Sequence, residues 1–403
     1  MHVGAHIQCL IGALLVFSYC HAQEPGCVPP LPCAEQNRKL TSDPRFHGLA
    51  PRVGTITSGS HVAFGAAYQW QAPDELPLDW EISGLYSIRN YQQYGARIGR
   101  LRTRRETFLL NPFGQRVTTE FNERRIKEPG LAAFADFNYF YFPRQNFFGL
   151  GPDSRREDRT DFLLEGTTIE AVAGYQFNSW FGASIRAGLL QLDVRDGKDD
   201  RYTNTSVLFP DVPGVEQQPD FYRISTAVLA DYRDLPGDPH RGGQAGFLFS
   251  HHQDKDSSSF QFNRYALDVR HYLPLDPLLS VVALRFLTSV DDPLGNGEVP
   301  FYLAEALGGG STLRGFSTLR FRDRNLLFLG GEFRTEVVDS VEIAVFYDTG
   351  KAFHDLDDYN LRGLQKGYGA GLRLKGGTTL FLRLDVGHSR EGTHLHFNVG
   401  PAF

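Results

Sequence analysis

The sequence predicts an all-β fold, a sixteen-stranded antiparallel transmembrane β-barrel. From about residue 60 onward, segments of roughly ten residues alternate apolar and polar side chains between turn residues, which is typical of membrane-spanning strands. The 42 Gly residues and the 13% of aromatic residues favour strands joined by tight turns. After the first two dozen positions, no apolar run reaches the roughly 18 residues that a helical span needs. A barrel agrees with all three observations because its strands present only alternate residues to lipid.

The amino-terminal part predicts a secreted chain. Residues 1–22 resemble a secretory signal, with an apolar stretch ahead of small residues but no Lys or Arg before it; a short buried amphipathic element is the alternative. Residues 23–59, rich in Pro and polar residues, predict a short periplasmic lead-in, and residues 60–403 the barrel. Without the signal only Cys27 and Cys33 remain, which in an oxidising periplasm either form a disulfide or stay free. The predicted location is the bacterial outer membrane.

Candidate strands and the links between them give an expected topology. We expect short links near Asn90, Asn178 and Pro236 at the periplasmic end, and long or charged links around Leu109 and Asp153 at the external end. An even number of strands places both termini at one end. The sixteen candidates begin near His61, Asp79, Gln93, Val117, Ala132, Phe162, Gly182, Phe221, Gly243, Phe260, Leu278, Leu326, Val341, Gly367, Thr378 and Thr393.

Side-chain alternation assigns the two faces of each strand, because successive residues point to opposite faces. In the last strand Leu395 and Phe397 fall on one parity, and His394 and His396 fall on the other. The apolar set, which includes the terminal Phe403, is expected to face lipid, where an ionised group would be costly. A soluble β-sandwich would also alternate, but it would not usually need so many long strands.

The polar residues do not predict a catalytic or metal site. No phosphate-binding or nucleophile-elbow motif occurs, and no third ligand can be identified for the paired histidines near the end of the chain. The acidic run departs from a calcium loop, and the net charge of −6 disfavours nucleic acid. We therefore expect no metal, no cofactor, no enzymatic activity and no nucleic-acid partner. The histidines and acidic residues to which this applies are His251, His252, His388, His394, His396, Asp193, Asp196, Asp199 and Asp200.

The last third of the chain carries motifs in a characteristic order. The first is the segment from Gly308 to Phe316, whose core is an aliphatic residue, Arg, Gly and an aromatic residue. Together with the segment from Phe148 to Pro152, this order resembles the BamA/TamA-type bacterial surface-antigen superfamily of outer-membrane assembly factors. The motifs that follow the first are Arg322-Asp323-Arg324-Asn325, Glu332-Phe333-Arg334, Phe346-Tyr347-Asp348-Thr349-Gly350, Gly369-Ala370-Gly371-Leu372-Arg373 and Arg383-Leu384-Asp385.

The resemblance implies a long sixth loop folded into the barrel lumen. There Arg314 would pair with the inward-facing Asp348 and Glu332, through the parallel hydrogen bonds that a guanidinium can donate to a carboxylate. The loop motif is Leu313, Arg314, Gly315 and Phe316. The other inward residues, expected to form a structural network of the lumen wall, are Arg334, Gly350, Gly369, Gly371, Arg373, Arg383 and Asp385.

The resemblance also implies a role in outer-membrane protein assembly, secretion or lipid handling, through the seam between the first and last strands and the sixth loop. Family members usually carry periplasmic polypeptide-transport domains before the barrel, and the segment 23–59 is too short for one. A separate periplasmic subunit is therefore one expected partner. The others are outer-membrane lipid and lipopolysaccharide, and the cell's barrel-assembly machinery, whose insertion signal Phe403 resembles. The alternative functions are a porin-like diffusion channel and a barrel-borne hydrolase.

Overall fold

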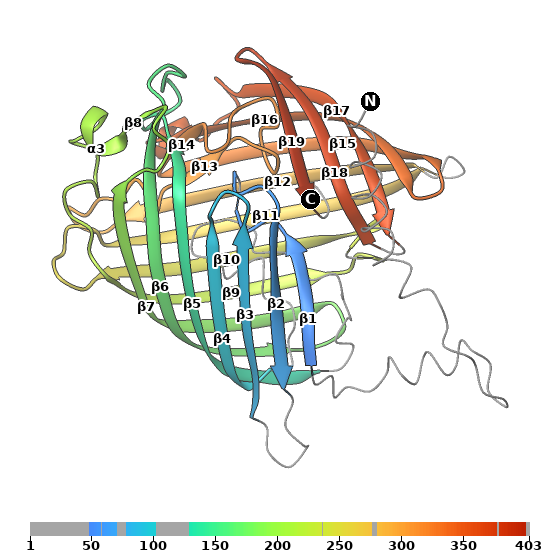
Figure 1. Cartoon of the computed structure of the whole chain (residues 1–403), viewed down its shortest axis with the longest axis horizontal. Coiled ribbons are helices and arrows are strands. Elements are labelled where there is room, and N and C mark those ends of the chain that lie inside the picture. Colours follow the sequence, from blue (N-terminus) through green and yellow to red (C-terminus); the bar gives the residue numbers. More distant parts are fainter. Residues whose placement is uncertain are drawn as a thin grey trace, which may run out of the picture. The chain divides into compact units, whose positions relative to one another are not determined.

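Strands make up most of the chain that can be described (Figure 1). The computed structural model describes residues 48–57, 59–70, 78–101, 129–235, 237–275, 280–376 and 379–399, which belong to one unit, Gly48–Phe403. The two helical elements in these ranges are short, α3 (Thr205–Leu208) and η1 (Leu356–Asp358). No helix within these ranges is long and apolar enough to cross a membrane. The all-β prediction is confirmed.

One antiparallel sheet follows the chain order. Each strand pairs with the next through a continuous ladder. The strands of this succession are β1 (Gly48–Gly54), β2 (Ala63–Trp70), β3 (Asp79–Ser87), β4 (Gln92–Arg100), β5 (Gly130–Phe147), β6 (Thr160–Gln176), β7 (Phe181–Asp196), β9 (Phe221–Asp231), β10 (Gly242–Asp254), β11 (Phe262–Leu275), β12 (Ser280–Pro293), β15 (Asn325–Val338), β16 (Val341–Phe353), β17 (Gln365–Gly376), β18 (Thr379–Ser389) and β19 (Gly392–Val399).

Three short strands lie outside this succession. β8 (Thr203–Asn204) pairs in parallel with β6, and β13 (Glu305–Leu307) pairs with β14 (Phe321–Asp323) in a separate two-stranded sheet. All three lie in links at one end of the main sheet, the end that also carries α3 and η1. The short links at residues 177–180 and 339–340 lie at the other end. From β5 onward most links therefore follow the predicted one-sided lengths, but residues 232–241 form a long link at the other end and residues 390–391 a short link at this end.

The first strands differ from the prediction. β1 lies inside the segment 23–59 that the sequence predicts to be a lead-in, so the sheet begins earlier than expected. β4 pairs directly with β5, although a strand near Val117 is predicted between them. Consequently Asn90 lies at the same end as the long loops, which reverses its predicted side. The region of Val117, the signal segment 1–22, Cys27, Cys33 and Phe403 lie outside the described residues.

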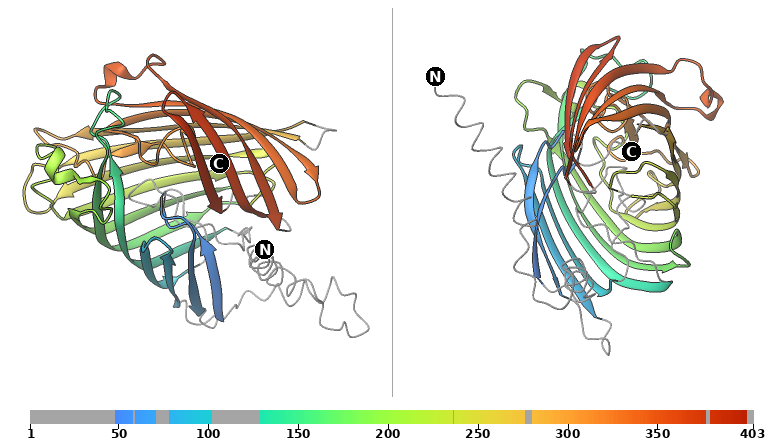
Figure 2. Two further views of the ribbon diagram at one scale, coloured as in Figure 1. Left: turned by 45° about the horizontal axis from the view of Figure 1, so that its top comes forward. Right: turned by 90° about the vertical axis from the view of Figure 1, so that its right-hand side faces the viewer.

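The sheet has one buried and one exposed face, as the alternation predicts. In β16 Ile343, Val345 and Tyr347 are 47%, 55% and 47% exposed, whereas Ala344 and Phe346 between them are 1% and 4% exposed. Two views show the main sheet curling around one of its two faces (Figure 2). A row of exposed apolar residues along each strand is the surface that a lipid bilayer covers, because water does not favour so large an apolar face.

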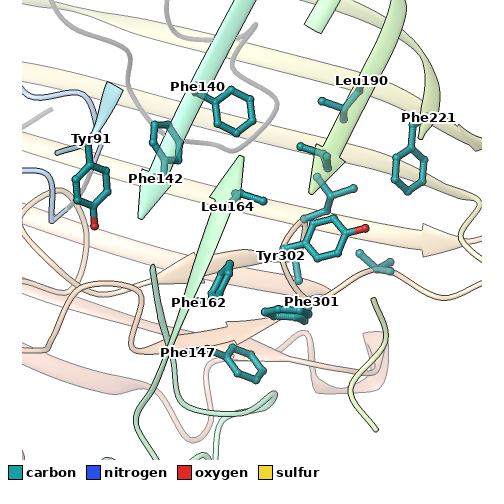
Figure 3. Close-up of a cluster of buried hydrophobic side chains, with 14 of the residues drawn as sticks. Tyr91, Phe140, Phe142, Phe147, Phe162, Leu164, Leu190, Phe221, Phe301 and Tyr302 are labelled. Carbon is teal, nitrogen blue, oxygen red and sulfur yellow. The ribbon is translucent and has the colours of Figure 1, made fainter. Parts of the chain in front are cut away.

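The largest apolar core lies at the end of the sheet with the long loops. Phe301 and Tyr302, from the link between β12 and β15, pack among Phe147 and Phe162 of β5 and β6 (Figure 3). The ring centroids of Phe301 and Phe162 are 4.9 Å apart at an interplanar angle of 67°. Such edge-to-face contacts add specificity to apolar burial. The core therefore fixes the start of this link against strands on another part of the sheet.

We predict that Val345→Arg destabilises the protein in lipid by about 2–4 kcal/mol, because an arginine on the outer face near the bilayer midplane loses its hydration. The same substitution at Val207, which is 69% exposed on α3 in the link between β7 and β9, is the matched control and should change stability little. Urea titrations in vesicles measure the free energy of unfolding. Equal effects of the two substitutions would contradict the assignment of the faces.

Candidate functional site

The link between β12 and β15, residues 294–324, carries the Arg-Gly-Phe motif and is anchored by buried apolar side chains. Leu313 and Phe316, on either side of Arg314, pack with Phe321 and Phe328 in one buried cluster. Ahead of them Gly308 and Gly309 have φ angles of 118° and 94°, a backbone conformation that residues with side chains rarely adopt. The glycine run therefore turns the chain, and the apolar anchors set the position of Arg314.

Arg314 pairs with two carboxylates on the buried face of the sheet. Its Nε and Nη2 atoms donate to Oδ2 and Oδ1 of Asp348 at 2.7 and 2.8 Å, and its backbone N–H donates to Oδ2 of the same residue at 3.1 Å. Its Nη1 atom donates to Glu332. The guanidinium also lies over the Phe346 ring, 3.6 Å from the centroid. Arg314, Asp348 and Glu332, which the sequence predicts to meet, are thus in direct contact.

The electrostatics of this pairing follow from burial. Arg314, Asp348 and Glu332 are 2%, 0% and 3% exposed, so water screens none of them effectively. Burial opposes the charged form of the guanidinium, but the neighbouring carboxylates outweigh it and raise the pKa of Arg314 above its ordinary value. The loop is therefore held by a permanent cation between fixed anions.

A wider ion-pair network surrounds Arg314. Nη2 of Arg373 lies 2.8 Å from Glu332, and its Nη1 lies 2.6 Å from Asp385. Nε of Arg383 lies 3.0 Å from the other oxygen of Asp385, and its Nη2 donates to the backbone carbonyl of Gly310 in the loop. With Arg314, Glu332 and Asp348, the set contains three guanidinium groups and three carboxylates. The network is therefore neutral only when the loop supplies Arg314.

The predicted glycines lie where the loop and the charged side chains approach the wall closely. A Cβ at Gly350 would meet Leu307, one at Gly369 would meet the Phe346 ring, and one at Gly371 would meet the Asp385 carboxylate. Gly315 of the loop lies against the backbone of β18, where a side chain would meet the carbonyl of His388. The absence of side chains at these positions thus makes room for the network.

Arg334 belongs to a different cluster from the one predicted. Its Nη1 lies 3.4 Å from Asp238 and its Nη2 donates to the carbonyl of Pro239, both in the turn between β9 and β10. A strand places residues two apart on the same face about 6.6 Å from each other, so Arg334 lies nearer the opposite end of the sheet than Glu332. The sequence assigns its face correctly but not its partner.

Two side chains of the last strands hold the loop backbone. Nε2 of His396 lies 2.7 Å from the carbonyl of Arg314, and the hydroxyl of Ser389 donates to the carbonyl of Gly315 at 2.5 Å. Beside them Gly387 lies so close to the Arg314 carbonyl that a Cβ there would clash with it. The sequence predicts no site at His396, and its inward parity is the one feature that points to this contact.

Arg320 joins three links at the end of the sheet that carries the long loops, and the sequence does not predict this role. It lies between the rings of Phe148 and Phe321, 4.8 and 4.5 Å from their centroids, and forms an ion pair at 2.9 Å with Glu391. Its Nη1 donates at 2.9 Å to the hydroxyl of Ser154. The segment 148–152, predicted as a motif, is thus in contact with the loop that carries Arg314. A flanking Arg in a loop carries no periodic signal from which this position could be predicted.

The remaining candidate residues do not converge on one site. His251 and His252 lie on β10, where His252 stacks on Phe262 at 4.3 Å, whereas the other three histidines lie on β18 and β19. In the acidic run, Arg201 donates two hydrogen bonds of 2.7 Å to Asp199 and lowers the pKa of that carboxyl to about 2. Asp193 likewise pairs with Arg195 at 2.8 Å. Asp193 and Asp199 are therefore paired with arginines.

These features define the class of protein: a large antiparallel meander sheet whose buried face binds an Arg-anchored loop. An Omp85 superfamily domain matches residues 102–403, and the chain belongs to this superfamily. The predicted family resemblance is confirmed.

The solved structures add a fold comparison. BamA from Haemophilus ducreyi lacking POTRA domains 1–3 is 12% identical, with a TM-score of 0.60, and the match covers 88% of this chain and 70% of that chain. CdiB from Escherichia coli is 13% identical, with a TM-score of 0.49, and its match covers 88% of this chain and 62% of that chain. The first similarity shows that the fold is BamA-like. No curated protein matches the chain.

We predict that Arg314→Ala exposes the loop to trypsin, because Asp348 and Glu332 lose a buried partner at a cost of about 3–5 kcal/mol. Arg314→Lys should restore part of the protection, since an ammonium keeps the charge but not the parallel hydrogen bonds. Cleavage at Arg320 and Arg322 in outer-membrane vesicles measures the effect. Arg324→Ala, which removes an ion pair of 3.5 Å to the 73% exposed Asp355, is the control. Unchanged cleavage of Arg314→Ala would refute the pairing.

We predict that Arg320→Ala speeds amide hydrogen exchange in residues 148–159 and near Glu391, because both segments lose their shared cation. Removal of a charged hydrogen-bond partner should lower local protection by about 1.5–3 kcal/mol. Arg155→Ala, at an exposed arginine paired only locally with Glu157 and Asp158 in the contacts described, is the control. Equal exchange in the two variants would show that Arg320 does not join these links.

Proposed function

We propose that the chain is a sixteen-stranded barrel of the bacterial outer membrane, with the β12–β15 link as a sixth loop inside its lumen. The uninterrupted succession of ladders from β1 to β19 supports this architecture, together with the exposed apolar rows on the outer face. The bidentate contact between Arg314 and Asp348 supports the position of the loop. In this proposal residues 1–22 act as the secretion signal, and Phe403 as the insertion signal read by the cell's assembly machinery.

We further propose that it acts in outer-membrane protein assembly, secretion or lipid handling, through the seam between β1 and β19. These two strands have 7 and 8 residues, against 18 in β5. Within the described ranges they approach each other, but no ladder joins them. The unpaired N–H and C=O groups of such edges can bind an incoming strand, because β-augmentation needs only backbone partners. Membership of the superfamily favours this role.

The structural features favour assembly over a passive channel. A diffusion channel needs an open lumen, whereas the loop carrying Arg314 is buried against the wall and Phe301 and Tyr302 pack into a core at the outer end. We propose no enzymatic activity for the chain, since the buried charges around Arg314 are engaged with one another. Outer-membrane lipid, lipopolysaccharide and a periplasmic subunit remain proposed partners.

We predict that depletion of the chain from its host lowers the amount of folded outer-membrane proteins or disturbs lipid asymmetry. Wild-type chain should restore both, and Arg314→Ala should restore them less well than Arg324→Ala. Quantitative proteomics of outer membranes and surface labelling of phospholipid measure the two outcomes. Unchanged protein levels and lipid asymmetry on depletion would refute the assembly proposal. Large, stable single-channel openings that persist in Arg314→Ala would support a porin instead.

A further inference from the structure

Three consecutive residues of the turn between β9 and β10 (residues 232–241) are buried at a position where a periplasmic turn would ordinarily be exposed. Gly237, Asp238 and Pro239 are buried, although the neighbouring Leu235 and Arg241 are exposed. Asp234 shapes this end of the turn by accepting hydrogen bonds from the backbone N–H groups of His240 and Arg241 at 3.0 and 3.2 Å. The buried residues must therefore be covered by another part of the chain.

The covering elements are β15, β16 and β17. Arg334 of β15 lies 3.4 Å from Asp238 and donates to the Pro239 carbonyl. Nζ of Lys375 in β17 lies 3.1 Å from Asp238, and Nε2 of His240 lies 3.5 Å from Glu342 in β16. Along the sheet β17 is five places from β10, a path of about 24 Å. The turn therefore reaches these strands across the buried face of the sheet and not along its edge.

His240 is the group in this cluster whose ordinary pKa lies nearest to neutral pH. Asp238 and His240 on the turn face Arg334, Glu342 and Lys375 on the wall. Glu336 of β15 completes the set, 3.2 Å from Lys375. With Asp234, whose carboxylate also lies beside His240, four carboxylates face two cations, so the cluster carries an excess of negative charge that a protonated His240 reduces. Protonation of His240 therefore favours the docked turn.

The same residues could also suggest a metal site, but the position of Lys375 argues against it. Oxygen atoms of Asp238 and Glu342 and a ring nitrogen of His240 lie within 4.8 Å of one another. However, Nζ of Lys375 lies 3.1 and 2.6 Å from the same two oxygen atoms that His240 approaches. The ammonium group therefore takes the place that a cation would need.

We propose that the β9–β10 turn is a pH-sensitive strap, docked across the inner end of the sheet on β15–β17 when His240 is protonated and released when it is neutral. The hydrogen bond to Glu342 and the charge of Asp238 raise the pKa of His240 above 6.5, against the opposing effects of burial, Arg334 and Lys375. Docking is therefore strongest below pH 6.5, and it weakens as the pH rises through the higher pKa of the docked state.

Thiol labelling tests the strap in the full chain. The four native cysteines are replaced by serine, and Pro239→Cys introduces a thiol at a position that is buried only while the strap is docked. Leu235→Cys, on an exposed residue of the same turn, gives the reference rate and corrects for thiolate formation at each pH. A membrane-impermeant maleimide is the probe. We expect the ratio of the Pro239→Cys rate to the Leu235→Cys rate to rise severalfold, up to about tenfold, between pH 5.5 and 8.5.

Wall and turn variants give the decisive comparison. Arg334→Gln should raise the labelling ratio at pH 5.5 by about tenfold, whereas Arg324→Gln should not, because Arg324 pairs with Asp355 at the other end. His240→Gln should remove the pH dependence, and His240→Lys should protect the thiol at both pH values.

A ratio that does not change with pH, or that changes equally in His240→Gln, would overturn the proposal. Heat-modifiable gel mobility verifies folding, and Asp238→Asn replaces Arg334→Gln if that variant fails to fold.

Discussion

The buried contact between Arg314 and Asp348 is the interaction on which the arrangement of the last strands depends. Asp348, Glu332 and Asp385 are fixed on the buried face of the sheet, and the wall residues that form ion pairs with them in the described part of the chain are Arg373 and Arg383. Burial of an uncompensated carboxylate is costly, and breaking such a pair costs more than the pair contributes relative to an apolar replacement. The wall therefore requires the loop as much as the loop requires the wall. This mutual dependence explains why glycines at several wall positions leave the space that the loop occupies.

The same contact organises the backbone of the final strands. Once Arg314 is in place, its carbonyl accepts from His396 and the carbonyl of Gly315 accepts from Ser389, so β18 and β19 are bound from the inside. β19 consequently does not rely on a full ladder with β1 for its position. A weakly paired edge is ordinarily a liability for aggregation. Here the loop can hold that edge in place while its outer hydrogen-bonding groups stay available to a partner.

Parts of this arrangement could be predicted from the sequence because they follow from periodicity and local chemistry. The period of two in β16 and β19 assigns Asp348 and His396 to the inner face, and the motif around Arg314 identifies the loop. The strand β1 could not be predicted, since its Pro51 and two glycines carry no alternating pattern, and its pairing with β2 supplies what its own sequence lacks. The partners of Arg320 and Arg334 could not be predicted either, because each meets residues far away in the sequence through contacts that only the curled sheet creates.

Three neighbouring strands take part in both charged clusters. β15 supplies Glu332 to the loop and Arg334 to the strap, β16 supplies Asp348 and Glu342, and β17 supplies Arg373 and Lys375. On β15 and β17 the two contributing residues are two positions apart, which is about 6.6 Å along a strand. A shift of these strands by one such step would misalign the loop and the strap together, because both depend on short ion pairs. The loop and the strap therefore depend on the same register of β15–β17.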